Sequence, residues 1–299
     1  MDAGNSFAGI FNDPGESRAR ARLLMKIYHE VGYEFVAVGS KELDLGTDFL
    51  MKESGRNHLR LLSANIYKDG KRVFAPYAVT TVKGVRVGIV GLTDYKGNGF
   101  SNKRGFTVKE PEGELKYAVE KLKAHGVGFI ILMSDIPQRR LNSMLSAFED
   151  IDLVIMGGRS GITRNPLRMK YACALSPSPK GKGLGVARVT LSNHGKILEI
   201  SNTPIQLRAN IESDKKVAQE VKAVLSSIKQ EKKGKKERPQ THSRENPFLK
   251  ALREAQKRRL AGQPPRDGNH GANATGVKPF FNLLKQGRGK GNSTRPAPR

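Results

Sequence analysis

Apolar and polar residues alternate along the first 228 residues at two spacings, which predict alternating helices and strands. Apolar residues at helical spacing predict helices over residues 17–31, 112–125, 137–148 and 213–228. Short runs rich in β-branched and other apolar residues predict strands over 34–38, 59–64, 77–82, 85–90, 128–133, 152–156, 186–191 and 197–200. The run at 128–133 is apolar throughout, which is typical of a strand buried on both faces.

Two pairs of these strands are joined by turn sequences, whereas helices separate most of the others. Lys83-Gly84 and Asn193-His194-Gly195 each lie between two β-rich runs and predict hairpins. The pattern as a whole predicts an α/β fold in which helices cover both faces of a mixed sheet, layered as a sandwich. A segment of 228 residues is long enough to bury a core of its own.

The composition changes after residue 228. Residues 229–299 hold 19 Lys and Arg against 5 Asp and Glu, a net charge of +14, and only three aromatic residues. Such a segment buries too little apolar surface to offset its ordering entropy, so we expect it to be mostly disordered. Asn246-Pro247 predicts the start of one short helix over 247–260. We therefore divide the chain into a domain at 1–228 and a basic tail at 229–299.

The remaining composition excludes several classes of protein. Cys173 is the one cysteine, which excludes an intramolecular disulfide framework and a thiolate-only zinc site. No apolar run reaches the roughly 18 residues that a transmembrane helix needs. The first residues as written contain neither the basic nor the apolar segment of an export signal.

Four turns next to predicted strands carry polar side chains suited to chemistry. They are Asp2-Ala3-Gly4-Asn5, Gly39-Ser40-Lys41-Glu42-Leu43-Asp44, Ser134-Asp135 and Gly157-Gly158-Arg159-Ser160-Gly161. Loops at the ends of strands are where folds of this class place functional residues. A further glycine run at 181–185 has the composition of a phosphate loop. It leads into a predicted strand rather than a helix, so we do not expect it to cradle a phosphate.

In this order and spacing, the four turns resemble the calcineurin-like metallophosphoesterases, in particular the bacterial 5′-nucleotidase and UDP-sugar hydrolase branch. Members of that family read Asp-x-Gly-Asp, Gly-Asn-His-Glu-x-Asp, Leu-Ser-His and Gly-Gly-His-x-His. The similarity continues at residues 62–66, 76–77 and 85–92 and covers about 1–228. It implies a four-layer α/β/β/α sandwich with mixed sheets.

The family's two metal ions are held by residues that this sequence changes. The resemblance places Asn5 at the bridging aspartate, Ser40 at an asparagine ligand, and Asp135, Arg159 and Gly161 at histidine ligands. Lys41 stands at the catalytic histidine, and Asp44, which orients that histidine in the family, is retained. Of the changed residues, only Asp135 offers a ligand for a hard cation. We therefore expect no metal cofactor and no dinuclear hydrolysis; an active enzyme would need divalent Mn, Zn, Co or Mg.

Two interpretations of the changed residues remain open. In one, Lys41 and Arg159 bind the phosphate of a small molecule directly, because a guanidinium suits bidentate phosphate contact. In the other, Asp135, Lys41 and Arg159 neutralise one another. The favoured function is a divergent, non-hydrolytic 5′-nucleotidase-like protein. One alternative is a phosphoester hydrolase with a reduced metal site at Asp44 and Asp135.

Another alternative is a binding protein whose basic tail contacts nucleic acid or an anionic surface. Residues 232–236 and 257–259 would make that contact, and it would depend strongly on salt. A general excess of basic residues explains the tail as well, since the preceding domain has a net charge of +11. We therefore do not favour this alternative.

Met1 stands where the family's first strand is already ending. We expect that strand, with its Asp-x-His pair, to lie upstream of the assigned start, because a missing central strand would leave backbone groups unpaired. An upstream export signal would make the protein extracytoplasmic, and the localisation is otherwise unknown. We find no counterpart of the family's C-terminal substrate-binding domain after residue 228.

Overall fold

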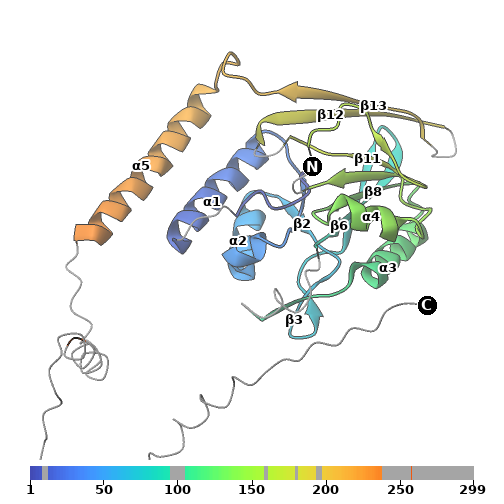
Figure 1. Ribbon diagram of the computed structural model, residues 1–299, viewed down its shortest axis with the longest axis horizontal. Coiled ribbons are helices and arrows are strands. Elements are labelled where there is room, and N and C mark those ends of the chain that lie inside the picture. The colour runs from blue at the N-terminus through green and yellow to red at the C-terminus, as the bar shows by residue number, and fades with distance from the viewer. Residues whose placement is uncertain are drawn as a thin grey trace, which may run out of the picture. The chain divides into compact units, whose positions relative to one another are not determined.

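The apolar run predicted as a buried strand forms β8 (Phe129–Ser134), an interior strand of a six-stranded sheet. The computed structural model describes residues 1–8, 13–94, 105–157, 161–178, 181–192, 197–237 and 257. The sheet has the order β10-β11-β9-β8-β6-β5, and Figure 1 labels its strands β11, β8 and β6. Its other strands are β5 (Tyr77–Val82), β6 (Val85–Leu92), β9 (Leu153–Met156), β10 (Leu167–Arg168) and β11 (Cys173–Leu175). Strands β6, β8, β9 and β11 run parallel and the two edge strands pair antiparallel, so the sheet is mixed, as predicted.

The turn between β5 and β6 shows how the local sequence sets the register of this sheet. Lys83 and Gly84 have φ values of 48° and 83°. Two successive positive φ values are the requirement of a tight hairpin turn whose twist matches that of the strands. The predicted hairpin is confirmed, with Val82 paired to Val85.

The other described strands form smaller sheets. β1 (Phe35–Ala37) pairs in parallel with β2 (Arg60–Leu62), and β12 (Gly183–Leu191) forms an antiparallel pair with β13 (Ile197–Gln206). β3 (Ile66–Lys68) pairs with both β4 (Lys71–Arg72) and β7 (Phe106–Val108). The hairpin of β12 and β13 is longer than predicted at its open end, because β12 begins in the glycine run.

Within the described ranges, the strands are covered by the helices α1 (Pro14–Glu30), α2 (Thr47–Arg56), α3 (Pro111–Ala124), α4 (Gln138–Leu145) and α5 (Lys215–Glu237). α1 begins three residues before the predicted start because Asp13 accepts hydrogen bonds from the N–H groups of Gly15 and Glu16. A side-chain cap of this kind satisfies N–H groups that the first helical turn leaves free. The hydropathy pattern did not predict α2.

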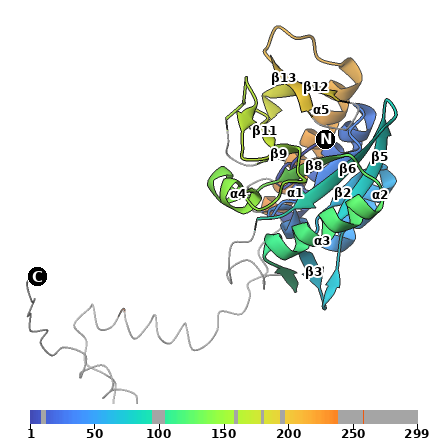
Figure 2. The ribbon, with the colours of Figure 1, turned by 90° about the vertical axis from the view of Figure 1, so that its right-hand side faces the viewer.

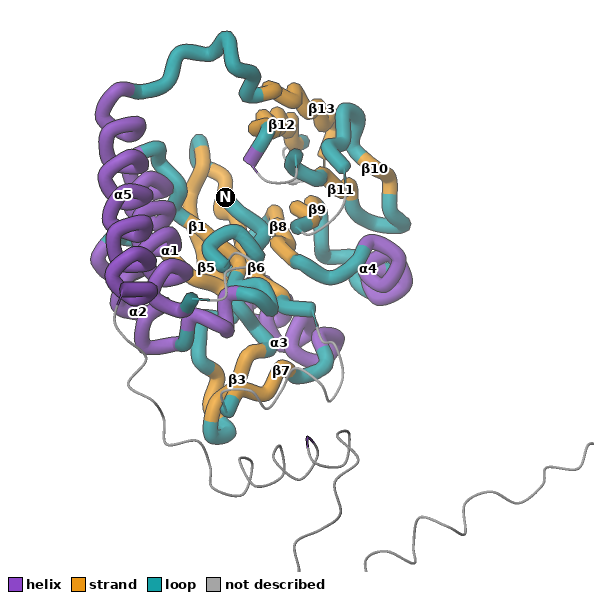
Figure 3. Tube along the Cα trace, turned by 60° about the vertical axis from the view of Figure 1, so that its left-hand side comes forward, coloured by secondary structure: helices purple, strands orange, loops and turns teal. Residues whose placement is uncertain are grey.

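Apolar clusters separate four layers. One lies between α3, α4 and the six-stranded sheet, around Leu122, Leu132 and Leu145. The second lies between α1, α2 and the β1–β2 pair, around Met25 and Leu50. The third lies between the six-stranded sheet and the strands β1, β2, β12 and β13 (Figures 2 and 3). The result is the expected α/β/β/α sandwich.

The last helix of the domain is longer than predicted. α5 was expected to end at residue 228 and continues to Glu237. It packs along α1, and two ion pairs join the helices: Lys26 Nζ lies 2.7 Å from Glu220 Oε2, and Lys232 Nζ lies 2.6 Å from Glu16 Oε2. Ile228 of α5 is buried. Residues 238–299 form a separate unit. Of the helix predicted at 247–260, Lys257 alone belongs to the described residues.

Within the described part of the chain, no helix combines the length and hydrophobicity needed to cross a bilayer.

Candidate functional site

The first of the four polar turns is held against β1 by backbone and side-chain hydrogen bonds of Asp2. The Asp2 N–H donates to the Phe35 carbonyl at 3.0 Å, so the turn leaves the sheet beside β1. The Asp2 carboxylate accepts from the Gly4 N–H at 2.9 Å, the Ser6 hydroxyl at 2.9 Å and the Tyr28 hydroxyl at 3.0 Å. Burial, with the neighbouring Asp2 carboxylate, raises the pKa of Tyr28 well above its usual value, so the phenol stays protonated as a donor.

Glycines let the first and second turns touch. A β-carbon on Gly4, where φ is 92°, would lie 2.8 Å from the Gly39 nitrogen. A β-carbon on Gly39 would lie 2.6 Å from the Asn5 Oδ1 atom, closer than any real contact. Asn5 itself has a φ of 63°, in the left-handed region that asparagine tolerates better than most residues. This backbone turns the Asn5 amide towards the second and third turns.

Glu42 joins the first two turns through hydrogen bonds of its buried carboxylate. Its side chain is buried, and its carboxylate accepts from the N–H groups of Asn5 at 2.8 Å, Gly39 at 2.9 Å and Phe7 at 3.0 Å. Burial raises the pKa of Glu42 to about 7, although the Phe7 and Asn5 N–H groups oppose the rise. Glu42 is therefore committed to holding the loops.

Asp135 is the centre of the site. Its Oδ2 accepts from the Asn5 side-chain amide at 2.8 Å and from the Ser40 N–H at 3.0 Å. Its Oδ1 accepts from the Asp94 N–H at 2.6 Å. The Asn5 Oδ1 accepts from the Lys41 N–H at 2.9 Å, which fixes the orientation of the amide. In the reverse orientation the NH₂ group would face the Lys41 N–H, and the amide oxygen would face the Asp135 carboxylate. The structure thus brings Asn5, Ser40, Lys41 and Asp135 together, from three turns.

The donor set at this centre does not fit a pair of divalent metals. Such ions need several oxygen or nitrogen ligands with free lone pairs. Here the Asp135 Oδ2 atom accepts two N–H groups, and Asp135 Oδ1 and the Asn5 oxygen accept one each, which leaves few lone pairs for a pair of cations; Asn5 also presents its NH₂ rather than an oxygen to Asp135. Gly161 is exposed and has no side chain to offer, and Arg159 lies outside the described residues. Across the described ranges, no three His, Cys, Asp or Glu side chains converge as a metal site would require.

The charged neighbours of this centre bear on the expected mutual neutralisation of Asp135, Lys41 and Arg159. N–H groups contact the Asp135 carboxylate, and because Arg159 lies outside the described residues, the neutralisation by all three groups stays a prediction. The Lys41 side chain is exposed, and no ion pair to it occurs within the described residues. Asp44 is also exposed, in the short helical turn Glu42–Leu45. Lys41 is thus an exposed cation whose backbone belongs to the site.

Sequence reasoning missed Thr93 and Asp94, which directly follow β6, a strand that was predicted over 85–90 and ends at Leu92. The Asp94 N–H contacts Asp135, and the Asp94 carboxylate lies 3.7 Å from Arg140. The Thr93 hydroxyl donates to the Val38 carbonyl at 2.6 Å, and the Asn65 amide donates to the Thr93 carbonyl at 2.8 Å. Their signal in the sequence was a polar pair at the end of a strand adjacent to β8, whose own end carries Asp135.

Comparison with known proteins identifies the fold. A snake venom 5′-nucleotidase from Gloydius brevicauda is 26% identical over 258 residues, which cover 77% of this chain and 42% of that protein. A 5′-nucleotidase from Vibrio parahaemolyticus is 41% identical over 66 residues, 21% of this chain and 12% of that protein. The chain therefore spans less than half the length of these relatives. No protein-family model matches the chain.

Solved structures agree with this relationship. The 5′-nucleotidase precursor from Thermus thermophilus superposes with a TM-score of 0.65 at 22% identity, over 76% of this chain and 49% of that one. The calcineurin-like phosphoesterase YfkN from Bacillus subtilis superposes with a TM-score of 0.64 at 16% identity, over 76% of this chain and 84% of that one. These similarities establish the fold of the described domain and its relation in sequence to 5′-nucleotidases.

Proposed function

Starting from a domain with the calcineurin-like phosphoesterase fold, we propose that this protein is a divergent 5′-nucleotidase-like member that does not hydrolyse phosphoesters through two metals. One observation carries the proposal. The Asn5 amide and Asp135 carboxylate hydrogen bond at 2.8 Å where the resemblance places metal ligands, and the remaining Asp135 oxygen is also taken by an N–H group. The site holds its own loops together with groups that would otherwise hold metals.

The chemistry of these hydrogen bonds supports the proposed absence of two-metal hydrolysis. Two-metal hydrolysis needs cations that polarise the phosphoryl group and generate a hydroxide at neutral pH. A cation bound at the Asp135 Oδ2 atom would have to displace the Asn5 amide and the Ser40 N–H, and the buried Ser40 N–H would then lose its partner. Leaving a buried donor without a partner costs on the order of 1–3 kcal/mol for each group.

We propose that Lys41 binds phosphate at this centre; Arg159, the other candidate from the sequence, lies outside the described residues. The Lys41 ammonium is exposed beside the network, while its backbone N–H is held by Asn5. The Ser40 and Lys41 N–H groups already have partners, so the side-chain charge is what remains for an anion. Titration with inorganic phosphate tests the assignment. Lys41→Gln should weaken binding several-fold, whereas Lys52→Gln, on the exposed side of α2, should not; equal affinities for both variants would contradict it.

Activity assays test the loss of hydrolysis. The purified full chain should not turn over 5′-AMP, UDP-glucose or a model phosphodiester with Mn²⁺, Zn²⁺, Co²⁺ or Mg²⁺. Asp135→Asn and the matched surface variant Asp69→Asn are assayed beside it, with thermal unfolding to confirm that each is folded. Metal-dependent turnover that survives Asp69→Asn and disappears in folded Asp135→Asn would overturn the proposal and favour a hydrolase with a reduced metal site.

A further inference from the structure

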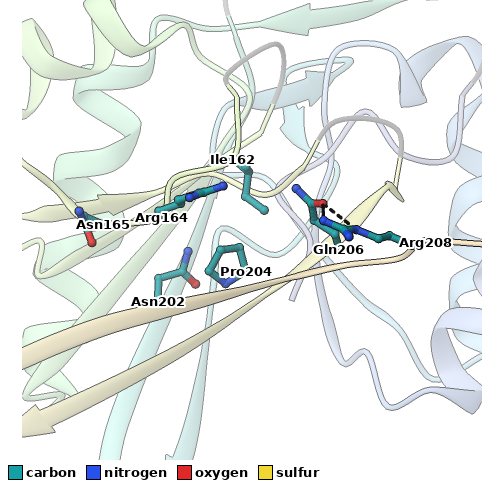
Figure 4. A pocket seen from close by; sticks show the side chains of 7 residues that line it. All are labelled: Ile162, Arg164, Asn165, Asn202, Pro204, Gln206 and Arg208. Carbon is teal, nitrogen blue, oxygen red and sulfur yellow. Dashed lines mark hydrogen bonds between the residues drawn. The ribbon is translucent and has the colours of Figure 1, made fainter. Parts of the chain in front are cut away.

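A basic pocket lies on the β12–β13 hairpin among residues that the four turns do not include (Figure 4). Its volume is about 560 Å³, within the range of small-molecule sites. Ile162, Arg164 and Asn165 line it from the loop before β10. Asn202, Pro204 and Gln206 line it from β13, and Arg208 follows that strand. Two guanidinium groups and three amides therefore face a pocket whose lining contains no carboxylate.

The pairing of the two strands explains why the surface is hollow here. Asn202, Pro204 and Gln206 alternate along β13 and so lie on one face, and their partners on β12 are Ala187, Gly185 and Gly183. The residues of β12 opposite these three side chains are thus two glycines and an alanine, so β12 presents no side chain larger than a methyl group there. The glycine run that is unsuited to a helix-borne phosphate loop instead leaves room for a ligand on a strand.

The same face of the hairpin changes character along its length. Val189, Leu191 and Ile200 pack against the core between the sheets. From Ala187 towards the start of β12, the same face has polar side chains and a proline on β13 and only that alanine and glycines on β12. A continuous apolar face would have closed against the neighbouring strands, so this change in sequence is what opens the pocket.

The loop that carries Arg164 is fixed on both sides through Thr163. The Thr163 N–H donates to the Ser176 carbonyl at 3.1 Å, and the Ser176 N–H donates to the Thr163 hydroxyl oxygen at 2.9 Å. The Asn202 amide donates to the Thr163 carbonyl across the pocket. The loop and the hairpin are therefore joined, and the position of Arg164 relative to β13 is set before a ligand arrives.

The two arginines differ in how they are held. Arg208 donates to the Gln206 side-chain oxygen at 3.3 and 3.1 Å, which leaves other N–H groups of its guanidinium for a ligand. Arg164 is exposed, and none of the described residues forms an ion pair with it. In Figure 4, Arg164 lies on the loop side and the Gln206–Arg208 pair lies beyond Ile162 and Pro204. A guanidinium group with N–H groups to spare suits phosphate oxygens, and the pocket has one on each side.

We propose that this pocket binds an organic phosphate monoester, with Arg164 and Arg208 on the phosphate and Asn165, Asn202 and Gln206 on the polar organic part. Inorganic phosphate would use the arginines alone. An organic phosphate adds hydrogen bonds to amides that can donate and accept. The pocket is separate from the Lys41 centre, so the two proposals stand or fall independently.

Calorimetric titration of the full chain with 5′-AMP, ribose 5-phosphate and inorganic phosphate tests this site. At least one organic phosphate should bind tighter than inorganic phosphate. Arg164→Gln and Arg208→Gln should each weaken it about tenfold, since each removes a charged hydrogen bond. Arg188→Gln is the matched control, because Arg188 lies on the opposite face of β12 and pairs with Ser201. Gly185→Leu should block binding while leaving both charges, because its β-carbon would lie 3.2 Å from the Oδ1 atom of Asn202 and the longer side chain would crowd that amide.

Each outcome of this titration is decisive. Weakening by the two pocket variants and by Gly185→Leu, with Arg188→Gln unchanged, supports the site. Weakening by Lys41→Gln alone assigns the ligand to the other centre and overturns the pocket. An absence of binding by every probe, or equal effects of Arg188→Gln and Arg164→Gln, also overturns it. Thermal unfolding of each variant confirms that the fold is intact.

Discussion

Asn5→Asp is the substitution that most directly tests the hydrogen-bond network at the site. The two side chains have the same shape, and the aspartate keeps an oxygen for the Lys41 N–H. The change replaces the amide that donates to Asp135 with a second carboxylate, at an oxygen–oxygen separation near the present 2.8 Å. We expect the variant to fold and to be less stable at neutral pH.

The size of the effect follows from the distance. Two unit charges 2.8 Å apart repel by about 6 kcal/mol at an effective dielectric constant of about 20, and by about 1.5 kcal/mol in bulk water. The protein avoids the larger value by binding a proton, which at pH 7 costs about 4 kcal/mol for an aspartate with an ordinary pKa near 3.9. The free energy of unfolding should therefore fall by about 2–4 kcal/mol at pH 7.

The pH dependence has a definite sign. A carboxyl pKa raised in the folded variant means that the folded state binds more protons than the unfolded state, so stability falls as pH rises. The deficit relative to wild type should shrink by up to about 1.4 kcal/mol for each pH unit below 7. Urea unfolding followed by circular dichroism at pH 5, 6 and 7 measures it; the chain has no tryptophan. Asn210→Asp, at an exposed turn, is the matched control. An Asn5→Asp variant as stable as wild type at pH 7, or a deficit that does not change with pH, would refute the geometry.

Three other predictions concern the loops and the last helix. Burial raises the pKa of Glu42 to about 7, so this group should lower the free energy of unfolding of the wild type by on the order of 3 kcal/mol between pH 4.5 and 7. Glu42→Gln should remove that pH dependence. Profiles of unfolding free energy against pH that run parallel for the two proteins would contradict this. Gly39→Ala should lower the free energy of unfolding by about 2–4 kcal/mol, because its β-carbon would lie 2.6 Å from Asn5 Oδ1. Gly55→Ala, with open space around it in α2, should raise the free energy of unfolding by about 0.5–1 kcal/mol. Urea unfolding measures both changes, and equal effects of the two variants would contradict the prediction. Ile228 is buried, so Ile228→Ala should destabilise the docking of α5 on α1 by about 2 kcal/mol. Amide hydrogen exchange should then become faster in α5 but not in β8. Exchange that becomes equally faster in α5 and β8 would show that α5 does not open separately.

Hydropathy predicted the elements whose stability comes from apolar faces. The strands β6 and β8, the hairpin at Lys83-Gly84 and the helix α3 all follow from local sequence. α2 was missed because its buried positions include Glu53, which ion pairs with Arg22 and Arg56. The hydropathy pattern counts Glu53 as a polar position, although its carboxylate is buried and ion pairs with arginines from two helices.

The end of α5 was misplaced for a similar reason. After Ile228 the sequence becomes Lys- and Glu-rich and loses its apolar face, so hydropathy predicts an end there. Lysine and glutamate are nevertheless good helix formers, and Lys232 ion pairs with Glu16 of α1. Helix propensity and a tertiary ion pair extend the helix beyond the apolar pattern.

The candidate site could be located from the sequence, but its hydrogen bonding could not. The order of the four turns predicted which residues would meet, and the structure places Asn5, Ser40, Lys41 and Asp135 together. Nothing in the sequence indicates that Asp135 is stabilised by N–H groups rather than by Lys41. That choice depends on the left-handed backbone at Asn5 and on the close approach of Gly39, which only the folded chain defines.

A crystal of the full-length protein soaked in manganese and measured at the manganese absorption edge tests the central claim most directly. If Asn5 and Asp135 are committed to each other, anomalous difference density should contain no manganese peak beside them, and their hydrogen bond should persist. Two manganese peaks a few ångströms apart next to Asn5, Ser40 and Asp135 would contradict the account.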